Sequence, residues 1–136
     1  MGKPRTRTTL PRSVRIRSRA DFKRMFEVRL RASDRWITLY GRGGPARHAR
    51  LGIAVGRAVG SAVHRNRRKR LVREAFRRIR HELPPQTDWV IVLRPGPEPT
   101  VGQLQDSIRQ LARRLSDKMK INHGGPETRR TQERES

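Results

Sequence analysis

The amino-acid sequence predicts an α+β fold in which a small sheet is covered by helices. In three segments, apolar residues recur every three or four positions, which is the period of an amphipathic helix. Between these segments lie short runs rich in β-branched and aromatic residues, each ended by glycine or proline. Along the chain the elements follow the order helix, strands, helix, strand, helix, which is typical of the α+β class.

The first helix is expected to begin at Ser18-Arg19-Ala20-Asp21, which is similar to a capping box. Phe22, Met25 and Phe26 then share one face at helical spacing. From the pattern alone, Phe22 and Phe26 are either core anchors or rings that stack on unpaired bases. A weaker strand is expected near residues 27–30.

Three clearer strands are expected further along the chain. Residues 36–40, Trp-Ile-Thr-Leu-Tyr, are followed by a glycine-rich turn over residues 41–45. Residues 51–55, Leu-Gly-Ile-Ala-Val, form the next strand. Residues 88–94 are almost continuously apolar and precede three prolines, a pattern typical of a central strand buried on both faces.

The longest helix is expected from about Ala62 to Glu82, before Pro84 and Pro85. One side of this helix is apolar and is formed by Val72, Ala75, Phe76, Ile79 and Leu83. The other side carries four arginines at spacings of three and four, namely Arg70, Arg73, Arg77 and Arg80. We therefore expect the helix to cover the sheet with one face and to present guanidinium groups on the other.

A last helix is expected from the capping residue Thr100 to about Met119. Its buried stripe consists of Val101, Leu104, Ile108, Leu111 and Leu115. The two ends of the chain are rich in charge and lack apolar periodicity, so residues 1–17 and 120–136 are expected to be disordered tails. We therefore predict one folded domain over residues 18–119.

Charge is the most informative property of the composition. The chain has 34 Lys and Arg residues against 12 Asp and Glu residues, a formal net charge of +22. A domain with this charge repels itself unless a polyanion neutralises it. Nucleic acid is favoured over an anionic membrane or an acidic protein, because phosphate contacts release counterions. Of the basic residues 29 are arginines, whose planar fork fits phosphate, although genomic codon bias explains that excess equally well.

The sequence offers no protein-based active site. It contains no cysteine, which excludes disulfides and cysteine nucleophiles and fits a cytoplasmic protein. No apolar run approaches the ~20 residues of a membrane span. The histidines lack metal-ligand spacing, and no nucleophile stands near a base. Gly52, Gly56 and Gly60 lack the Gly-Lys-Ser/Thr ending of a phosphate loop and are interpreted as close backbone packing and a turn. We therefore expect no catalytic residue, metal site, small-molecule ligand or membrane contact.

The densest basic segment runs from Arg57 to Arg80 and holds ten Lys and Arg residues with one acid, Glu74. Its centre, Arg65-Asn66-Arg67-Arg68-Lys69-Arg70, falls in the first turns of the long helix. Free backbone N–H groups and arginine side chains can converge on a phosphate at such a helix start. A solvated helix face and a nuclear-localisation signal are the alternative interpretations.

Three consecutive stretches form a recognisable pattern: residues 51–57, Leu-Gly-Ile-Ala-Val-Gly-Arg, residues 59–63, Val-Gly-Ser-Ala-Val, and residues 65–76, Arg-Asn-Arg-Arg-Lys-Arg-Leu-Val-Arg-Glu-Ala-Phe. Together they resemble the signature of the bacterial ribonuclease P protein subunit. The similarity extends to Asp21-Phe22 with Phe26, to Tyr40 and to residues 88–92, and covers roughly residues 15–117. Ala58 departs from the pattern, since the family often has a second Lys or Arg there.

The resemblance implies an α-β-β-β-α-β-α arrangement with a mixed four-stranded sheet and a left-handed βαβ crossover. It also implies a non-catalytic protein subunit of ribonuclease P, a ribonucleoprotein endonuclease whose RNA subunit removes the 5′ leader of precursor tRNA. Mg²⁺ is then expected in the holoenzyme, held mainly by RNA and not by protein side chains. The expected partners are ribonuclease P RNA and precursor tRNA, and the expected location is cytoplasmic.

The resemblance also assigns roles to individual residues. The contact with the RNA subunit is expected from Arg65, Asn66, Arg67, Arg68, Lys69, Arg70 and Arg73. The contact with the single-stranded leader is expected from Phe22, Phe26, Tyr40 and Arg57. The principal alternative is a basic ribosomal or ribosome-assembly protein with no role in processing, which shares the charge but does not predict these placed residues.

Overall fold

The structure, a computed structural model, describes residues 10–16, 18–27 and 30–123. Along the chain the elements are the 3-10 helix η1 (Arg12–Val14), helix α2 (Arg19–Glu27), strands β1 (Arg31–Ser33), β2 (Ile37–Gly43) and β3 (Arg50–Val55), the 3-10 helix η2 (Arg57–Val59), helix α3 (Ala62–Ile79), the 3-10 helix η3 (Arg80–Glu82), strand β4 (Thr87–Leu93) and helix α4 (Val101–His123). The α-helices and strands follow the order that the resemblance implied.

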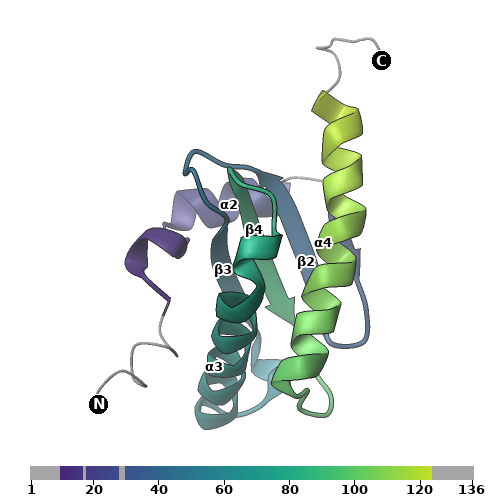
Figure 1. The fold of residues 1–136 in the computed structure, drawn as a ribbon. Coiled ribbons are helices and arrows are strands. Elements are labelled where there is room, and N and C mark those ends of the chain that lie inside the picture. The colour runs from purple at the N-terminus through teal and green to yellow at the C-terminus, as the bar shows by residue number, and fades with distance from the viewer. Residues whose placement is uncertain (1–9, 17, 28–29, 124–136) are drawn as a thin grey trace, which may run out of the picture.

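The four strands form one mixed sheet in the order β1-β2-β4-β3. Strand β4 pairs antiparallel with β2 and parallel with β3, and its side chains are buried on both faces, as its apolar run predicted. In Figure 1, β3 and β4 run down the page, α3 lies in front of them, and β4 lies to the right of β3, so the crossover is left-handed. Such crossovers are right-handed in about 98% of cases, so the apolar pattern could not have predicted this hand.

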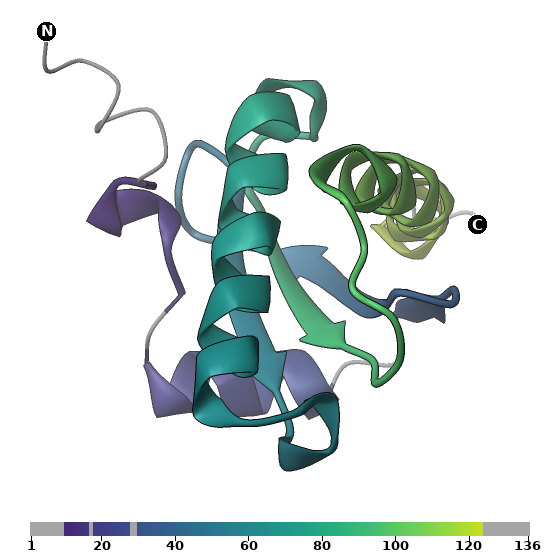
Figure 2. The same ribbon diagram turned by 90° about the horizontal axis from the view of Figure 1, so that it is seen from below.

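The two faces of the sheet are covered differently (Figure 2). Helices α3 and α4 lie on one face, and α2 lies across the other. Under α3 and α4 is the main core, which includes Phe76 and Trp89 as predicted. Under α2 is a smaller cluster of Ile16, Met25 and Val90, and partly buried side chains pack against it. Alternation along β4 explains the division, because successive side chains of a strand point to opposite faces.

Hydroxyl groups cap the first and last helices, as predicted. The Ser18 Oγ accepts hydrogen bonds from the backbone N–H groups of Ala20 and Asp21, at 3.1 and 3.3 Å. At the start of α4, the Gln103 N–H donates to the Thr100 Oγ1 at 3.1 Å, and the Thr100 N–H donates to the Gln103 Oε1 at 2.9 Å. These bonds satisfy backbone donors that a helix start otherwise leaves unpaired.

The predicted N-terminal boundary at residue 18 is wrong for residues 10–16. Leu10, Val14 and Ile16 are 1%, 2% and 3% exposed and belong to the two cores. The Ile16 N–H donates to the Leu51 carbonyl at 2.8 Å, so this segment runs along the outer edge of β3. Its apolar residues follow neither helical nor strand periodicity, so periodicity could not predict that they belong to the core. The rest of the predicted tail, residues 1–9, lies outside the described residues.

Three other predicted boundaries moved. Strand β1 is Arg31–Ser33 instead of residues 27–30, of which residues 28 and 29 lie outside the described part. Strand β2 continues through Gly43, across the predicted turn, because these residues pair with the start of β4. Helix α4 continues past Met119 to His123, just before two helix-disfavouring glycines. The remaining predicted tail, residues 124–136, is outside the described range.

Candidate nucleic-acid interface

The first turns of α3 present a basic surface. Among the residues predicted to contact RNA, Asn66, Arg67 and Arg70 are exposed, and Arg65, Lys69 and Arg73 are half-buried. Arg67 forms an ion pair with Glu98 at 3.2 Å, but two thirds of the arginine side chain remains in solvent. An exposed pair of this kind contributes little and leaves the guanidinium accessible to phosphate.

Arg68 does not belong to this surface, although it stands within the basic run. It is 7% exposed, and its Nη2 donates to the Gly96 carbonyl at 2.6 Å. A longer contact of 3.5 Å joins its Nη1 to the Arg94 carbonyl. The prediction that Arg68 contacts RNA is therefore corrected: its guanidinium joins α3 to the loop after β4. The sequence carried a signal for this, because position 68 lies four residues before Val72 on the buried side.

Arg15 adds a guanidinium that sequence analysis missed. A hollow of about 200 Å³ is lined by Arg15, Lys69 and Arg73, above a floor formed by Leu10, Ile16, Phe22, Leu51 and Ile53. No acidic residue is among the described residues that line it. Burial lowers the pKa of Arg73, and the charges of Arg15 and Arg70 lower it further. These guanidinium groups repel one another, and an anion bound among them would relieve that repulsion.

Further along α3, the arginines are paired within the protein. Glu74 accepts hydrogen bonds from Arg77 at 2.8 Å and from Arg78 at 2.7 Å. Desolvation raises the pKa of Glu74, but the hydrogen bonds from both arginines outweigh it and keep the pKa below its ordinary value. Of the predicted four-arginine face, Arg77 is thus partly neutralised, and the basic surface is concentrated at the start of α3.

Phe22, Phe26 and Tyr40 form an aromatic platform on the α2 side of the sheet. The ring centroids of Phe22 and Phe26 are 6.3 Å apart, and the Phe26 ring meets Tyr40 edge-on at 5.1 Å. Phe22 and Tyr40 are half-buried, whereas Phe26 is 44% exposed. The pattern left open whether the two phenylalanines are core anchors, and the structure shows that neither is fully buried.

Gly52 explains how Phe22 reaches its position. A Cβ atom at residue 52 would lie 2.8 Å from the Phe22 Cζ, which is closer than such contacts allow. The expectation of close backbone packing at Gly52 is therefore confirmed. Phe22 also lines the hollow with Lys69 and Arg73, so the aromatic platform and the basic surface of α3 are continuous.

Arg57 follows the C-terminal end of β3, so it lies at the end of the sheet away from Arg50, where β3 begins. It is the first residue of η2 and is exposed, two residues beyond the end of that strand. Gly60, with φ of 144°, then turns the chain into α3, as its predicted role in a turn requires. The structure thus brings three of the four predicted leader-binding residues together and places Arg57 between β3 and α3.

Within residues 10–16, 18–27 and 30–123, no cluster of three or more His, Cys, Asp or Glu side chains could hold a metal ion. In the same part of the chain, no helix has the length and apolar character needed to cross a membrane.

A protein-family model described as Ribonuclease P matches residues 10–116. The chain belongs to this family. A ribonuclease P protein component from Methylococcus capsulatus is 44% identical over 85 residues, which is 62% of this chain and 66% of the relative. One from Xanthomonas campestris pv. campestris is 42% identical over 106 residues, covering 76% of this chain and 70% of the relative. The RNase P protein from Thermotoga maritima has a TM-score of 0.66 at 30% identity, covering 74% of this chain and 96% of that one.

These comparisons support the ribonuclease P interpretation. They give no support to the ribosomal alternative. The match to the family model begins at residue 10, and Leu10 is 1% exposed in the structure. The α+β fold with a four-stranded mixed sheet is likewise shared with the solved family members.

Proposed function

We propose that this chain is the protein component of a ribonuclease P ribonucleoprotein, where it binds the catalytic RNA subunit and the 5′ leader of precursor tRNA. It thereby assists the endonucleolytic removal of the leader that produces the mature tRNA 5′ end. The observation that carries this proposal is the continuity between the basic surface of α3 and the aromatic platform, in a chain of this family.

The basic surface is assigned to the RNA subunit. Its residues are Arg15, Arg65, Asn66, Arg67, Lys69, Arg70 and Arg73. Guanidinium groups bind phosphate in two-point geometry, and each phosphate contact releases condensed counterions. Binding on this surface also relieves the mutual repulsion of Arg15 and Arg73.

The aromatic platform is assigned to the leader. A single strand exposes its base faces, and these stack on aromatic side chains without requiring a particular sequence. The exposed ring of Phe26 offers such a face, and it packs beside Phe22 of the same helix and edge-on to Tyr40 of β2. Arg57 is assigned to a leader phosphate at the far end of β3.

Catalysis is assigned to the RNA subunit, with Mg²⁺ held mainly by RNA, and the holoenzyme is expected in the cytoplasm. The protein contributes positive charge where two polyanions must approach each other. Since salt screens such charges, its benefit should decline as ionic strength rises.

The test is cleavage of precursor tRNA at low magnesium and near-physiological salt. It compares a ribonuclease P RNA alone, the protein alone, and the two together. Efficient cleavage by the combination only, leaving a mature 5′ end, is the expected result. If the protein leaves cleavage unchanged yet binds structured RNA tightly, the ribosome-assembly function replaces this one.

Two double variants locate the RNA-binding surface, with binding to the RNA subunit titrated over a range of salt concentrations. Arg67→Ala with Arg70→Ala removes two exposed charges from α3, and Arg113→Ala with Arg114→Ala removes two from the exposed side of α4. The α3 pair should reduce the slope of log affinity against log salt for the RNA subunit by about 1.4 to 1.8. The α4 pair should leave that slope unchanged, and equal effects from both pairs would contradict the assigned surface.

A further inference from the structure

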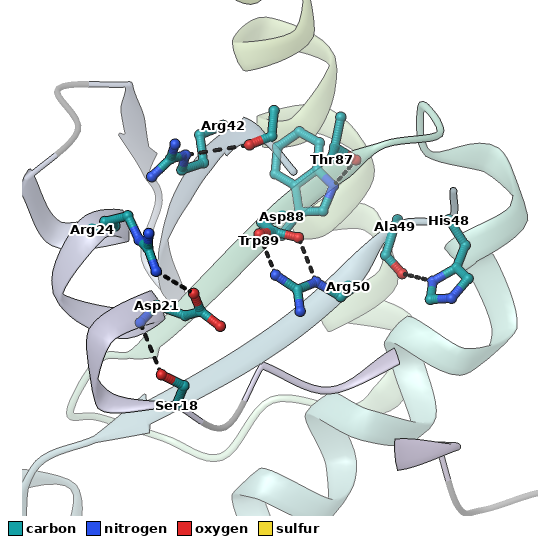
Figure 3. Close-up of polar contacts among 11 residues, drawn as sticks. Ser18, Asp21, Arg24, Arg42, His48, Ala49, Arg50, Thr87, Asp88 and Trp89 are labelled. Atoms are coloured by element: carbon teal, nitrogen blue, oxygen red, sulfur yellow. Dashed lines mark hydrogen bonds and ion pairs between the residues drawn. The ribbon is translucent and has the colours of Figure 1, made fainter. Parts of the chain in front are cut away.

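A second, larger hollow lies between α2 and the strand ends (Figure 3). Its volume is about 560 Å³, and it is lined by Asp21, Arg24, Met25, Arg42, Gly43, Gly44, Pro45, Gln86 and Asp88. Unlike the hollow beside α3, it combines carboxylates with guanidinium groups over the apolar side chain of Met25. Such a mixture suits a ligand that carries both hydrogen-bond donors and negative charge.

The hollow adjoins the aromatic platform along two elements. On α2, Asp21 and Met25 immediately precede Phe22 and Phe26. On β2, Arg42 lies two residues beyond Tyr40, so both side chains are on the α2 side of the sheet.

The strand register places the hollow at a defined end of the sheet. Arg42 is opposite Asp88 on β4, and Asp88 is opposite Arg50, the first residue of β3. Arg57 follows the other end of β3. A single strand that passes from Arg57 over the aromatic platform therefore reaches this hollow next.

The two carboxylates in the hollow differ in what they can still bind. Asp88 accepts two hydrogen bonds from Arg50, at 2.8 and 2.7 Å, and its side chain is 8% exposed. Gly44 also packs against it, so Asp88 is a fixed part of the floor. Asp21 is 30% exposed, and the one side-chain pairing found for it among the described residues is the bond that its Oδ1 accepts from Arg24 at 3.0 Å.

The guanidinium groups at the rim are placed to hold phosphate. Arg42 donates from its Nε to the Gly43 carbonyl at 3.3 Å, which holds the stem while its terminal nitrogens remain for a ligand. Arg24 is anchored by Asp21, and more than half of its side chain is exposed. Arg42 therefore combines a fixed stem with accessible terminal nitrogens, whereas Arg24 is held through its Nη2 and keeps the rest of an exposed guanidinium for a ligand.

We propose that this hollow holds one unstacked base of the RNA leader, with the Asp21 carboxylate accepting from the base edge and Arg24 and Arg42 binding the flanking phosphates. This inference rests on the proposed function. A carboxylate only accepts hydrogen bonds, so it selects bases that present an exocyclic amino group, namely adenine, cytosine and guanine. Uracil is disfavoured, because its single ring N–H is flanked by two carbonyl oxygens that a carboxylate repels.

A randomised-leader competition tests the base selection. The reconstituted holoenzyme cleaves a pool of precursor tRNAs with random leader sequences, and the remaining substrate is sequenced. The wild-type protein should disfavour uracil at one leader position by about fivefold or more. Asp21→Asn should abolish that preference and leave the other positions unchanged, because an amide donates as well as accepts.

Asp106→Asn is the matched control. Asp106 also pairs with an arginine three residues later, Arg109, but it lies on α4 and is 72% exposed. It should leave every leader preference at the wild-type value. Identical preferences for the wild-type protein and Asp21→Asn at all positions would overturn the inference and leave Asp21 as a surface ion-pair residue.

A thermal melt shows whether Asp21→Asn still folds. If it does not, Arg42→Ala provides an independent test. Arg42→Ala should weaken binding of long leaders several-fold and have no effect once the leader is too short to reach the hollow. Equal effects at all leader lengths would contradict the inference.

The proposed function has a separate readout. If the wild-type holoenzyme binds precursor tRNA no more tightly than mature tRNA, leader binding itself fails. If that advantage is present but the Asp21 and Arg42 variants behave as the wild type, only the base-binding hollow fails.

Discussion

The two faces of the sheet use aromatic residues in opposite ways. On the face covered by α3 and α4, Phe76 and Trp89 are 0% and 1% exposed within the main core. On the face crossed by α2, Phe26 is 44% exposed, and Phe22 and Tyr40 are half-buried. Exposed apolar clusters on a folded domain commonly mark interaction sites, so the first face stabilises the fold and the second is the one that we propose binds the leader.

The difference follows from how much helix covers each face. Helices α3 and α4 have 18 and 23 residues and bury a continuous stripe of side chains. Helix α2 has nine residues, of which only Met25 is fully buried. A helix this short cannot cover the sheet, so the rings beside it remain accessible.

The largest expected effect belongs to the covered face. Phe76→Ala should lower the free energy of unfolding by about 3–5 kcal/mol, because it leaves a cavity that the surrounding core cannot fill. Urea or thermal unfolding of the isolated protein measures this. A loss below about 1 kcal/mol would show that α3 does not pack as described and would remove the contrast between the faces.

The same contrast explains which parts of the fold were predictable. Helix α3 and strand β4 have long and strongly patterned sequences, so their positions followed from periodicity and apolar runs. Residues 10–16 and the end of β2 are instead held by pairing with distant strands. Such pairing depends on the tertiary fold and overrides local signals such as the glycines of β2.

The candidate site was likewise only partly predictable from the sequence. The spacing of Phe22 and Phe26 placed both on one helical face, but their contact with Tyr40 depends on where α2 crosses the sheet. The basic run grouped Arg68 with its neighbours, whereas burial separates it from them. Arg15 was missed because its segment resembles a basic tail. Composition thus identified the kind of ligand, and tertiary packing decided which residues can reach it.

An intermediate effect is expected from the buried arginine on the covered side. Arg68→Ala should lower the free energy of unfolding by about 1–3 kcal/mol, because it leaves the Gly96 carbonyl without its charged donor. Arg70→Ala, two residues along the same helix and exposed, should change stability by about 0.5 kcal/mol or less. Unfolding of both variants in parallel checks this. Equal stability losses would contradict the structural role of Arg68.

The smallest effect on folding should come from the open face. Phe26→Ala should lower the free energy of unfolding by about 0.5–1.5 kcal/mol, roughly the value of its edge contact with Tyr40. Its affinity for precursor over mature tRNA should nevertheless fall by about 1–3 kcal/mol, because a base loses its stacking partner.

Phe26→Leu and Phe26→Trp separate these two contributions of Phe26. Leucine keeps apolar packing without an aromatic face, so it should retain stability and lose leader affinity, whereas tryptophan should retain leader affinity. Binding titrations of the holoenzyme, with unfolding measured on the same samples, provide both values. If leucine preserves leader affinity, Phe26 acts by packing alone, and the open face must recognise the leader through its charges.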